Sequence, residues 1–532
     1  MLIIIANIIA GIITGTIMSD SSLPSLIQQM LQPGFYPHPV TEPIQLIQTH
    51  VSFVLLTGDY VYKLKKPVNF GFLDYSTLEK RRHFCNEELR MNKRGAAELY
   101  LDILPITQTG EKYNLGGSGE AVEYTLKMRQ FPQEALFTNI FERGELTDRL
   151  MEDLGRVVAE FHTHAPINDY IRSFGKVSQL RKAFDENYQQ TEKYIGGPQT
   201  QQQFEETRQF TDAFFADRED VFKQRIANNW IRECHGDLHL RNIALWQDKI
   251  MLFDCIEFNE DFRFVDVMFD IAYAVMDMDA RDRGDLGNAY LNTYVEQIGD
   301  WEGLQVLPLY LSRQSYVRAK VISFLLDDPA IPAEEKEKAS KTAAQYYKLA
   351  WQYTQKRPGK LILMSGLSGS GKSTAARHLA RKLGAIHIRS DAVRKHLGGI
   401  PLYEKGGNDL YTPEMTQKTY QRVLDLGITL AKQGYRVILD AKYDRIALRS
   451  AAISAAENNH IPLQIIQCTA PVEEMRRRLS LRIGDIADAT ADLLASQQAS
   501  AEGFSETETP YLKVIDTTHN LDSQLESILA VD

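Results

Sequence analysis

A glycine-rich run between an apolar segment and a helical pattern constrains this chain more than any other feature. Residues 361–365 (LILMS) predict a strand, residues 366–374 read GLSGSGKST, and the helical pattern begins at Ala375. Glycines in such a run let backbone N–H groups close around phosphates at the positive end of a helix. We expect Lys372 to reach the β- and γ-phosphates and Ser373 to bind Mg²⁺. The phosphate-binding residues expected from the run are Gly366, Ser368, Gly369, Ser370, Gly371, Lys372, Ser373 and Thr374.

The segment around this run alternates between strand and helix patterns. The apolar segments LILMS, AIHIR, RVILD and LQIIQC are separated by helical stretches, a pattern that predicts a parallel sheet covered by helices. Before it, residues 355–360 (QKRPGK) form a linker, because the dipeptide Pro358-Gly359 cannot continue a helix. The sequence therefore predicts an α/β domain over residues 358–532.

Charged residues at the ends of these strands suggest what the domain does to a phosphate. Asp391 follows Lys372 by nineteen residues and can take a proton from an acceptor hydroxyl, although capping a helix is the alternative. Arg394, one turn later, can hold the acceptor or its phosphate. Asp440 ends the segment RVILD, like the second carboxylate of a P-loop site, and is expected to help bind Mg²⁺.

A cluster of arginines follows the last of these strands. Arg478 and Arg482 are four residues apart in a helical pattern, which predicts that they share one face of a helix. Arginines in such a lid neutralise the charge that develops during phosphoryl transfer. The alternative is a solvated basic face, which many helices have.

A second set of polar residues lies between His235 and Asp254. The run reads CHGDLHLRNIALWQDKIMLFDCIEF, so Asp237 precedes Asn242 by five residues and Asp254 ends an apolar segment. Phosphoryl transfer needs a carboxylate beside the acceptor hydroxyl and oxygen ligands that hold Mg²⁺. We expect Asp237 to be that base, and Asn242 and Asp254 to bind the metal. The pattern resembles protein kinases, and more closely the aminoglycoside and choline phosphotransferases.

A lysine and a glutamate should accompany this set upstream. Lys63 ends a strand pattern and is placed like the lysine that holds the α- and β-phosphates; Lys65 points the same way and stays a candidate. Glu88, in a helical pattern, is placed like the partner of that lysine, with Glu87 as the alternative. The loop before Lys63 lacks a glycine-rich motif, since residues 49–52 read THVS.

Six segments resemble one fused family, which joins an aminoglycoside phosphotransferase-like kinase to a small P-loop kinase. They are VYKLKKPVNFGFLDYSTLEKRRHFCNEELRMN, HGDLHLRNI, FDCIEFN, GLSGSGKST, RSDAVRK and VILDA. The resemblance implies a bilobal α+β protein-kinase-like domain followed by an α/β P-loop kinase domain with a parallel sheet. It implies ATP and Mg²⁺ as cofactors. The domain limits expected are 1–18 for an extension, 19–357 for the first domain, with lobes over about 40–130 and 131–350, and 358–532 for the second.

Composition excludes several other classes. The chain has 532 residues, 44% hydrophobic and 24% charged, which predicts a globular protein of more than one domain. Net charge is −10, and residues 358–532 hold 21 basic and 20 acidic side chains, so nucleic acid is an unexpected partner. Four cysteines without a C-x-x-C motif favour a reduced, cytoplasmic protein.

The apolar N-terminus is an unusual feature. Residues 2–18 (LIIIANIIAGIITGTIM) carry no charge and are at the lower length limit of a membrane span. No Lys or Arg precedes Lys63, and no signal-peptide cleavage pattern is clear. We expect translation to begin at Met18, with a membrane anchor or a signal peptide as the alternatives.

These observations favour an ATP-dependent kinase with two sites, each transferring a γ-phosphate to hydroxyl groups of small molecules. One alternative makes the first domain a regulatory or binding module for the second. Another makes the C-terminal domain a kinase for nucleic-acid ends or sugar nucleotides. The identity of the acceptor and the oligomeric state are not predicted, since fold-level analogy names neither.

Overall fold

The computed structural model describes residues 23–529, so the apolar extension predicted at residues 1–18 lies outside the described residues. The chain forms two compact units, neither continuous in sequence. The first holds residues up to 146, then 160–280 and 307–354. The second holds residues 147–159, 281–306 and 355–532. Within the described range, every helix is too short or too polar to span a membrane.

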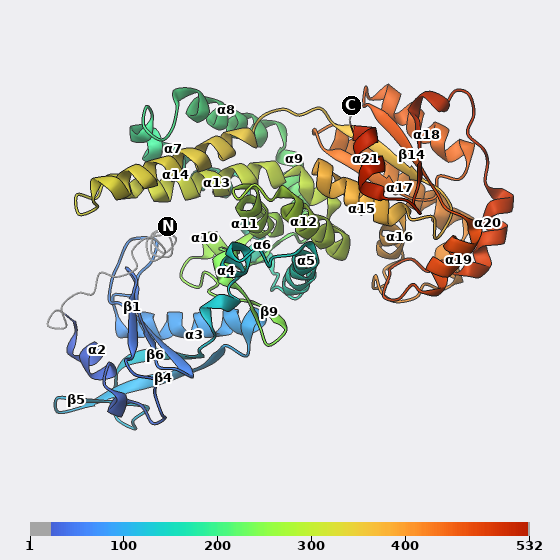
Figure 1. Ribbon diagram of the computed structural model, residues 1–532. Coiled ribbons are helices and arrows are strands. Elements are labelled where there is room, and N and C mark those ends of the chain that lie inside the picture. Colours follow the sequence, from blue (N-terminus) through green and yellow to red (C-terminus); the bar gives the residue numbers. More distant parts are fainter. Residues whose placement is uncertain (1–22, 530–532) are drawn as a thin grey trace. The chain divides into compact units, whose positions relative to one another are not determined.

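An antiparallel sheet forms one lobe of the first unit (Figure 1, blue). Its six strands run in the order β1-β2-β3-β6-β4-β5. They are β1 (Gln45–Gln48), β2 (Ser52–Leu56), β3 (Tyr60–Lys65), β4 (Tyr100–Thr109), β5 (Lys112–Leu115) and β6 (Ala121–Arg129). Alternation along β3 places Tyr62 and Leu64 in an apolar core with α2 (Ser25–Met30). The lysines of β3 therefore lie on the opposite face.

Helix α3 (Leu78–Ala96) belongs to the same lobe and carries a buried carboxylate. Thr77 caps its N-terminus, where the side chain accepts a hydrogen bond from the backbone N–H of Lys80 at 3.2 Å. Cys85, Glu88 and Met91 are buried, which is the i, i+3, i+6 spacing of one helical face. The helix thus places Glu88 inside the lobe.

The rest of the first unit is mostly helical, with two short strand pairs that hold its loops. Its helices include α4 (Phe137–Glu142), α6 (Asp169–Ser173), α7 (Val177–Thr191), α8 (Gln201–Asp217), α9 (Glu219–Ala227), α10 (Glu260–Arg263), α11 (Val267–Asp279), α13 (Leu307–Ser323) and α14 (Ala333–Gln352). The strand pairs are β7 (Ile231–Glu233) with β10 (Phe264–Asp266), and β8 (Ile243–Trp246) with β9 (Lys249–Leu252). The segment between β7 and β8 carries the HGD sequence.

A five-stranded parallel sheet forms the centre of the second unit and confirms the predicted parallel sheet. The strand order is β12-β13-β11-β14-β15. The strands are β11 (Lys360–Ser365), β12 (Ile386–Arg389), β13 (Arg436–Asp440), β14 (Leu463–Thr469) and β15 (Leu512–Asp516). The sequence pattern identified the first four and missed β15. The helices include α5 (Asp148–Thr163, mostly in this unit), α12 (Gly284–Ile298), α15 (Lys372–Leu383), α16 (Ser390–Gly398), α17 (Pro413–Ala431), α18 (Ile446–Asn458), α19 (Val472–Ser480), α20 (Leu494–Ser500) and α21 (Leu521–Leu529).

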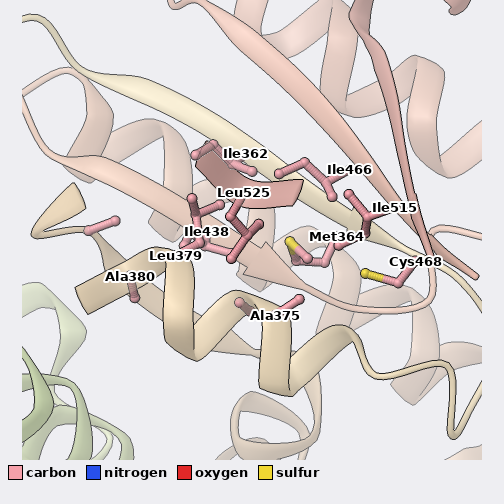
Figure 2. Close-up of a cluster of buried hydrophobic side chains, with 12 residues drawn as sticks. Ile362, Met364, Ala375, Leu379, Ala380, Ile438, Ile466, Cys468, Ile515 and Leu525 are labelled. Carbon is pink, nitrogen blue, oxygen red and sulfur yellow. The ribbon is translucent and has the colours of Figure 1, made fainter. Parts of the chain in front are cut away.

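Apolar side chains between the sheet and α15 form one core of this unit, as Figure 2 shows. The strands contribute Ile362, Met364, Ile438, Ile466 and Ile515. Ala375 and Ala376 of α15 are small, which lets the helix that follows the glycine-rich run approach the sheet closely. Each fully buried aliphatic side chain contributes roughly 1.5–3 kcal/mol, so this core holds the run at the strand ends.

Edge strand β12 is covered by a helix from a distant part of the chain, α12. Asn292 accepts a hydrogen bond from the backbone N–H of His387 at 2.8 Å. The side chains of Asn288 and Asn292 donate to the carbonyl of Ala385 at 2.9 and 3.0 Å. Because an edge strand otherwise exposes such groups, this helix satisfies them within the unit.

Candidate active sites

Lys63 of β3 joins two carboxylates of the first unit. Its Nζ donates to Glu88 at 2.7 Å and to Asp254 at 2.9 Å. Burial alone would lower the pKa of Lys63. The neighbouring carboxylates raise this pKa by more than burial lowers it, so the pKa lies well above its usual value. Glu87 instead pairs with Arg90, on a more exposed face of α3. The structure thus places Glu88, rather than Glu87, beside the lysines.

Lys65 has its own buried network beside the first pair. Its Nζ donates to the other oxygen of Glu88 at 2.6 Å and to Glu257 at 2.5 Å. Tyr75 donates its hydroxyl to Glu257 at 2.5 Å. Lys65 is 3% exposed, and its second carboxylate partner is Glu257, whereas that of Lys63 is Asp254. Both lysines left open by the sequence therefore contact Glu88, through different oxygens.

A buried aspartate, Asp270, binds the backbone of the segment that carries Asp237. Asp270 of α11 accepts backbone N–H bonds from His235 at 2.7 Å and Gly236 at 2.8 Å. His162 shares the same carboxylate at 3.1 Å. Gly236 has φ +86°, and a Cβ there would lie 2.6 Å from the carbonyl oxygen of Phe262, so only glycine fits. These contacts fix the loop that presents Asp237.

Asp237 keeps one carboxylate oxygen for a reaction partner. Oδ2 lies 3.4 Å from Nε2 of His239, while Oδ1 has no hydrogen-bond partner within residues 23–529. Burial raises the pKa of Asp237, but His239 and Arg318 outweigh it, so the carboxyl pKa lies below its usual value. The side chain therefore stays ionised at neutral pH.

The metal-binding candidates lie beside this base. The Asn242 side-chain nitrogen donates to the Asp237 carbonyl at 3.0 Å, which leaves its amide oxygen to bind a cation. Asp254 follows β9 with φ +61°, a left-handed conformation that aspartate tolerates. Lys63, Asp237 and Asp254 line one cavity of about 40 Å³, together with Thr49.

The turn that borders this cavity has hydroxyl side chains instead of a glycine-rich motif. The turn from β1 to β2 is closed by Thr49 and Ser52: the Thr49 backbone N–H donates to the Ser52 carbonyl, and the Thr49 hydroxyl accepts the Ser52 N–H, each at 2.9 Å. Both residues line the cavity. Thr49 and Ser52 thus occupy the turn in which a protein kinase would carry a glycine-rich loop.

In the second unit, residues 366–371 link β11 to α15. Gly371 caps the helix with φ +87°, and a Cβ there would lie 2.8 Å from the Thr517 side chain. Lys372, the first helical residue, donates its Nζ to the Leu367 carbonyl at 2.8 Å. Burial lowers the pKa of Lys372. Ser373 and Thr374 follow in the first turn of α15, where backbone N–H groups have no helical partner. The arrangement fits a phosphate cradle.

The rest of the cradle is supported from other elements. Gly366 donates its N–H to the Lys442 carbonyl at 2.9 Å. Ser368 accepts from and donates to Gln497, both at 3.1 Å. Gly369 has φ +78°, and the hydroxyl of Ser370 has no partner within the described part of the chain. The Ser370 hydroxyl is therefore available to a ligand.

Two carboxylates stand at the strand ends beside this cradle. Asp440 ends β13 next to β11, and its Oδ2 lies 3.0 Å from Nε2 of His387. Burial raises the pKa of Asp440, but His387 and Lys372 lower it to about 2. Asp391 lies in the first turn of α16, after β12, and burial raises its pKa above the usual value. The pKa values of the two carboxylates are thus shifted in opposite directions.

Arg394 and Arg482 lack carboxylate partners among the described residues, whereas Arg478 is fully engaged. Arg394 donates to the Leu410 carbonyl at 2.8 Å. Arg478 bonds Glu474 at 2.8 Å and the Thr517 hydroxyl at 2.8 Å. Nη1 of Arg482 is buried without a partner in residues 23–529.

The prediction that Arg478 and Arg482 share a helical face is wrong. Helix α19 ends at Ser480, so Arg482 lies beyond it. Met475 and Leu479 are the buried apolar residues of this helix. The next apolar residues, Leu481 and Ile483, are 63% and 94% exposed, so no packing holds a further turn.

Several contacts of both sites come from residues that the motifs did not indicate. Glu257 follows Asp254 by three residues, and an extra carboxylate in that run was the available signal. His387 and Arg389 are two residues apart on β12, so the period of a strand predicts that they share one face. Thr517 and Gln497 belong to no motif and are brought in only by the fold.

Two protein-family models match the chain, one in each of the segments that carry the candidate sites. The model described as "Phosphotransferase enzyme family" matches residues 131–307, and the model described as "AAA domain" matches residues 361–504. Uncharacterised proteins of Mycobacterium bovis and Mycobacterium tuberculosis are each 31% identical over 468 residues. These alignments cover 87% of this chain and 91% of each relative.

Solved structures similar to parts of the chain include kinases and a phosphotransferase. A sugar kinase from Janibacter sp. is 23% identical over 32% of this chain and 94% of its own, with a TM-score of 0.25. An APS kinase of Mycobacterium tuberculosis is 21% identical over 33% and 97%, with a TM-score of 0.24. Aminoglycoside 2′-phosphotransferase-IIIa is 11% identical over 61% and 99%, with a TM-score of 0.38.

The family matches agree with the geometry of the two sites. The first unit holds a lysine–glutamate pair and a free aspartate oxygen, and the second holds a P-loop at the ends of a parallel sheet. The protein is an enzyme that transfers phosphate. The chain belongs to the family, shared with these mycobacterial relatives, that joins a phosphotransferase domain to a P-loop kinase domain.

Proposed function

We propose that the protein transfers the γ-phosphate of ATP to hydroxyl groups of small molecules, with one catalytic site in each unit. The observation that carries this proposal is the pairing of a buried base with a phosphate anchor in both units. The first unit has Asp237 and Lys63, and the second has Asp391 and Lys372. A regulatory module would need no base, and both are present.

In the first unit, each residue has a separate task. Lys63 holds the α- and β-phosphates while Glu88 keeps its Nζ in place. The Oδ1 of Asp237 accepts the proton of the acceptor hydroxyl as the hydroxyl oxygen bonds the γ-phosphorus, and the bond from that phosphorus to the departing ADP breaks. Asn242 and Asp254 fit a magnesium ion, because Asp254 lines the cavity and Asn242, whose amide nitrogen bonds the Asp237 carbonyl, offers its amide oxygen. Magnesium would neutralise charge on the phosphates.

In the second unit, the cradle formed by residues 366–374 binds the phosphates of the nucleotide. Lys372 leaves the Leu367 carbonyl to contact the β- and γ-phosphates. The carboxylate of Asp391 takes the hydroxyl proton, and Arg394 orients the acceptor. Ser373 and Asp440 supply the oxygen ligands that fit magnesium, and Asp440 is held ionised for that purpose.

The test is product formation by the full chain from ATP, Mg²⁺ and a small-molecule cell extract, followed by mass spectrometry. Asp237→Asn and Asp391→Asn should each abolish a different phosphorylated product, or successive additions to one compound. We expect a loss of about 10²–10⁴ in rate from removing each base. Exposed aspartates of the same units serve as matched controls, namely Asp220→Asn and Asp492→Asn.

The variants also separate the alternatives. If only Asp391→Asn removes product, the first unit is a binding or regulatory module and the two-site proposal fails. If neither substitution alters any product while both controls behave normally, the assigned bases are wrong.

A further inference from the structure

The second unit contains a cavity of about 110 Å³ whose lining includes none of residues 366–374. Its walls come from α5, α12, α15, β12, Tyr403 and residues 484–486. An engineered cavity of about 150 Å³ holds benzene, so this one accommodates a group of phosphate size.

Arginines outnumber carboxylates in the lining. The arginines are Arg156, Arg377, Arg381 and Arg389. The carboxylates are Glu152, Glu296 and Asp485. Each carboxylate already has a guanidinium neighbour: Glu152 lies 2.6 Å from Arg381. Asp485 and Glu296 lie 2.5 and 3.7 Å from Arg389. Outside the lining, Asp148 pairs with Arg381 and Asp153 with Arg156, so Arg377 is the lining arginine that has no ion pair with the described residues.

Several guanidinium donors remain unused. Arg389 is 6% exposed, yet its Nε has no hydrogen-bond partner within residues 23–529. Nε of Arg381 is likewise buried without a partner in the described chain. Arg377 makes no ion pair or hydrogen bond with the residues that the structure describes. Leaving a donor buried and unpaired destabilises the folded chain, and a bound anion would offset that cost.

We propose that this cavity binds the phosphate group of a small metabolite, at a site separate from both nucleotide sites. A phosphate dianion presents several acceptor oxygens, and guanidinium groups match them with paired N–H bonds. Water also fits a polar cavity of this size and can satisfy single donors. It does not neutralise the unpaired guanidinium of Arg377, and this favours an anion.

The site lies one hydrogen bond from the P-loop machinery. His387 lines the cavity, and its Nε2 lies 3.0 Å from the carboxylate of Asp440. Strand period explains the placement, because His387 and Arg389 are two residues apart on β12 and point to the same face. The phosphate would therefore bind behind the carboxylate that we assign to magnesium.

The experiment uses the full chain with both nucleotide sites filled by the non-hydrolysable analogue AMPPNP and Mg²⁺. Inorganic phosphate is then titrated by calorimetry, and glycerol 3-phosphate in a second series represents a phosphomonoester. We expect saturable binding of one phosphate per chain. Arg377→Gln should weaken it about tenfold, because the variant loses a charged donor and no existing contact. Arg389→Gln should weaken it at least as much.

The control is Arg436→Gln, an arginine of the same unit outside the cavity, which should bind phosphate like the parent chain. If Arg389→Gln does not fold, Arg377→Gln alone decides, since that side chain has no described partner to lose. Absence of saturable binding with the nucleotide sites filled would overturn the proposal, as would equal affinity in Arg377→Gln and the parent. Either outcome would mean that the cavity holds water only, and neither bears on phosphate transfer at Asp237 or Asp391.

Discussion

Two lysines on one strand share the carboxylate of Glu88, and their other partners separate their roles. Lys63 also contacts Asp254 in the cavity, whereas Lys65 contacts Glu257 and is 3% exposed. Strand period placed both on one face, and nothing local distinguished them. Their difference comes from Glu257, which lies 192 residues from Lys65 and also accepts from Tyr75, so only the fold could resolve it.

Substitution of each lysine should therefore affect different properties. Lys65→Met leaves the buried carboxylate of Glu257 without its cation, and Glu88 with Lys63 alone, and should destabilise the first unit by about 3–5 kcal/mol. Lys63→Met leaves Glu88 paired with Lys65, so it should abolish nucleotide use at a smaller cost in stability. Urea unfolding and ATP binding measure the two effects, with Lys66→Met as a neighbouring control. Equal destabilisation by both substitutions would contradict this division.

The two bases should also respond differently to acid. The pKa of Asp391 is raised by burial, whereas that of Asp237 is lowered by neighbouring cations despite burial. A base must be ionised, so its rate falls as pH decreases through its folded pKa. Product of the second unit should therefore decline first on acidification from neutral pH, and product of the first unit at lower pH. Initial rates of both products against pH would refute this if the order were reversed.

At the scale of elements, β15 has a task beyond completing the sheet. The Thr517 hydroxyl, just after this strand, donates to the Ser370 carbonyl at 2.7 Å and accepts from Arg478. It thereby ties the phosphate cradle to α19. The sequence predicted the contiguous cradle, because spacing within the motif carries that information. It did not predict β15 or its contact, because a short strand of mixed burial resembles a loop.

Thr517→Val tests that tie with little change of volume. It removes the hydroxyl, leaving the Ser370 carbonyl and the Arg478 guanidinium short of a partner, at about 1–3 kcal/mol. The KM for ATP in the second unit should rise about tenfold, with a smaller change in kcat. Thr518→Val, at the neighbouring exposed position, should leave both constants unchanged. An unaltered KM in Thr517→Val would show that the cradle needs no such support.

For the whole molecule, the sequence predicted two continuous domains, whereas each compact unit combines segments that are separate in the sequence. A linker at residues 355–360 was visible as Pro and Gly in a polar run. The sequence did not predict that residues 281–306 belong to the second unit, because Asn288 and Asn292 resemble residues of a solvated helix face. Their partners are backbone groups of β12, which carry no sequence signature.

Cutting the chain at that linker should therefore harm the second unit. A fragment of residues 358–532 lacks α12 and exposes the β12 groups that Asn288 and Asn292 satisfy. We expect such a fragment to aggregate or to unfold at lower temperature, and a fragment of residues 281–532 to resist this better. Light scattering and thermal unfolding of both fragments provide the measurement. Equal behaviour of the two would show that α12 adds nothing.

The helix on β12 also bears on how such a gene can change. A recombination event at the linker moves the P-loop sheet without the asparagines that cover its edge, and leaves those asparagines behind without their partners. Exchange of either half with an unrelated gene then harms both products at once. Selection would act on the two coding segments as a single inherited block, and the fusion would persist even where the two reactions serve different needs.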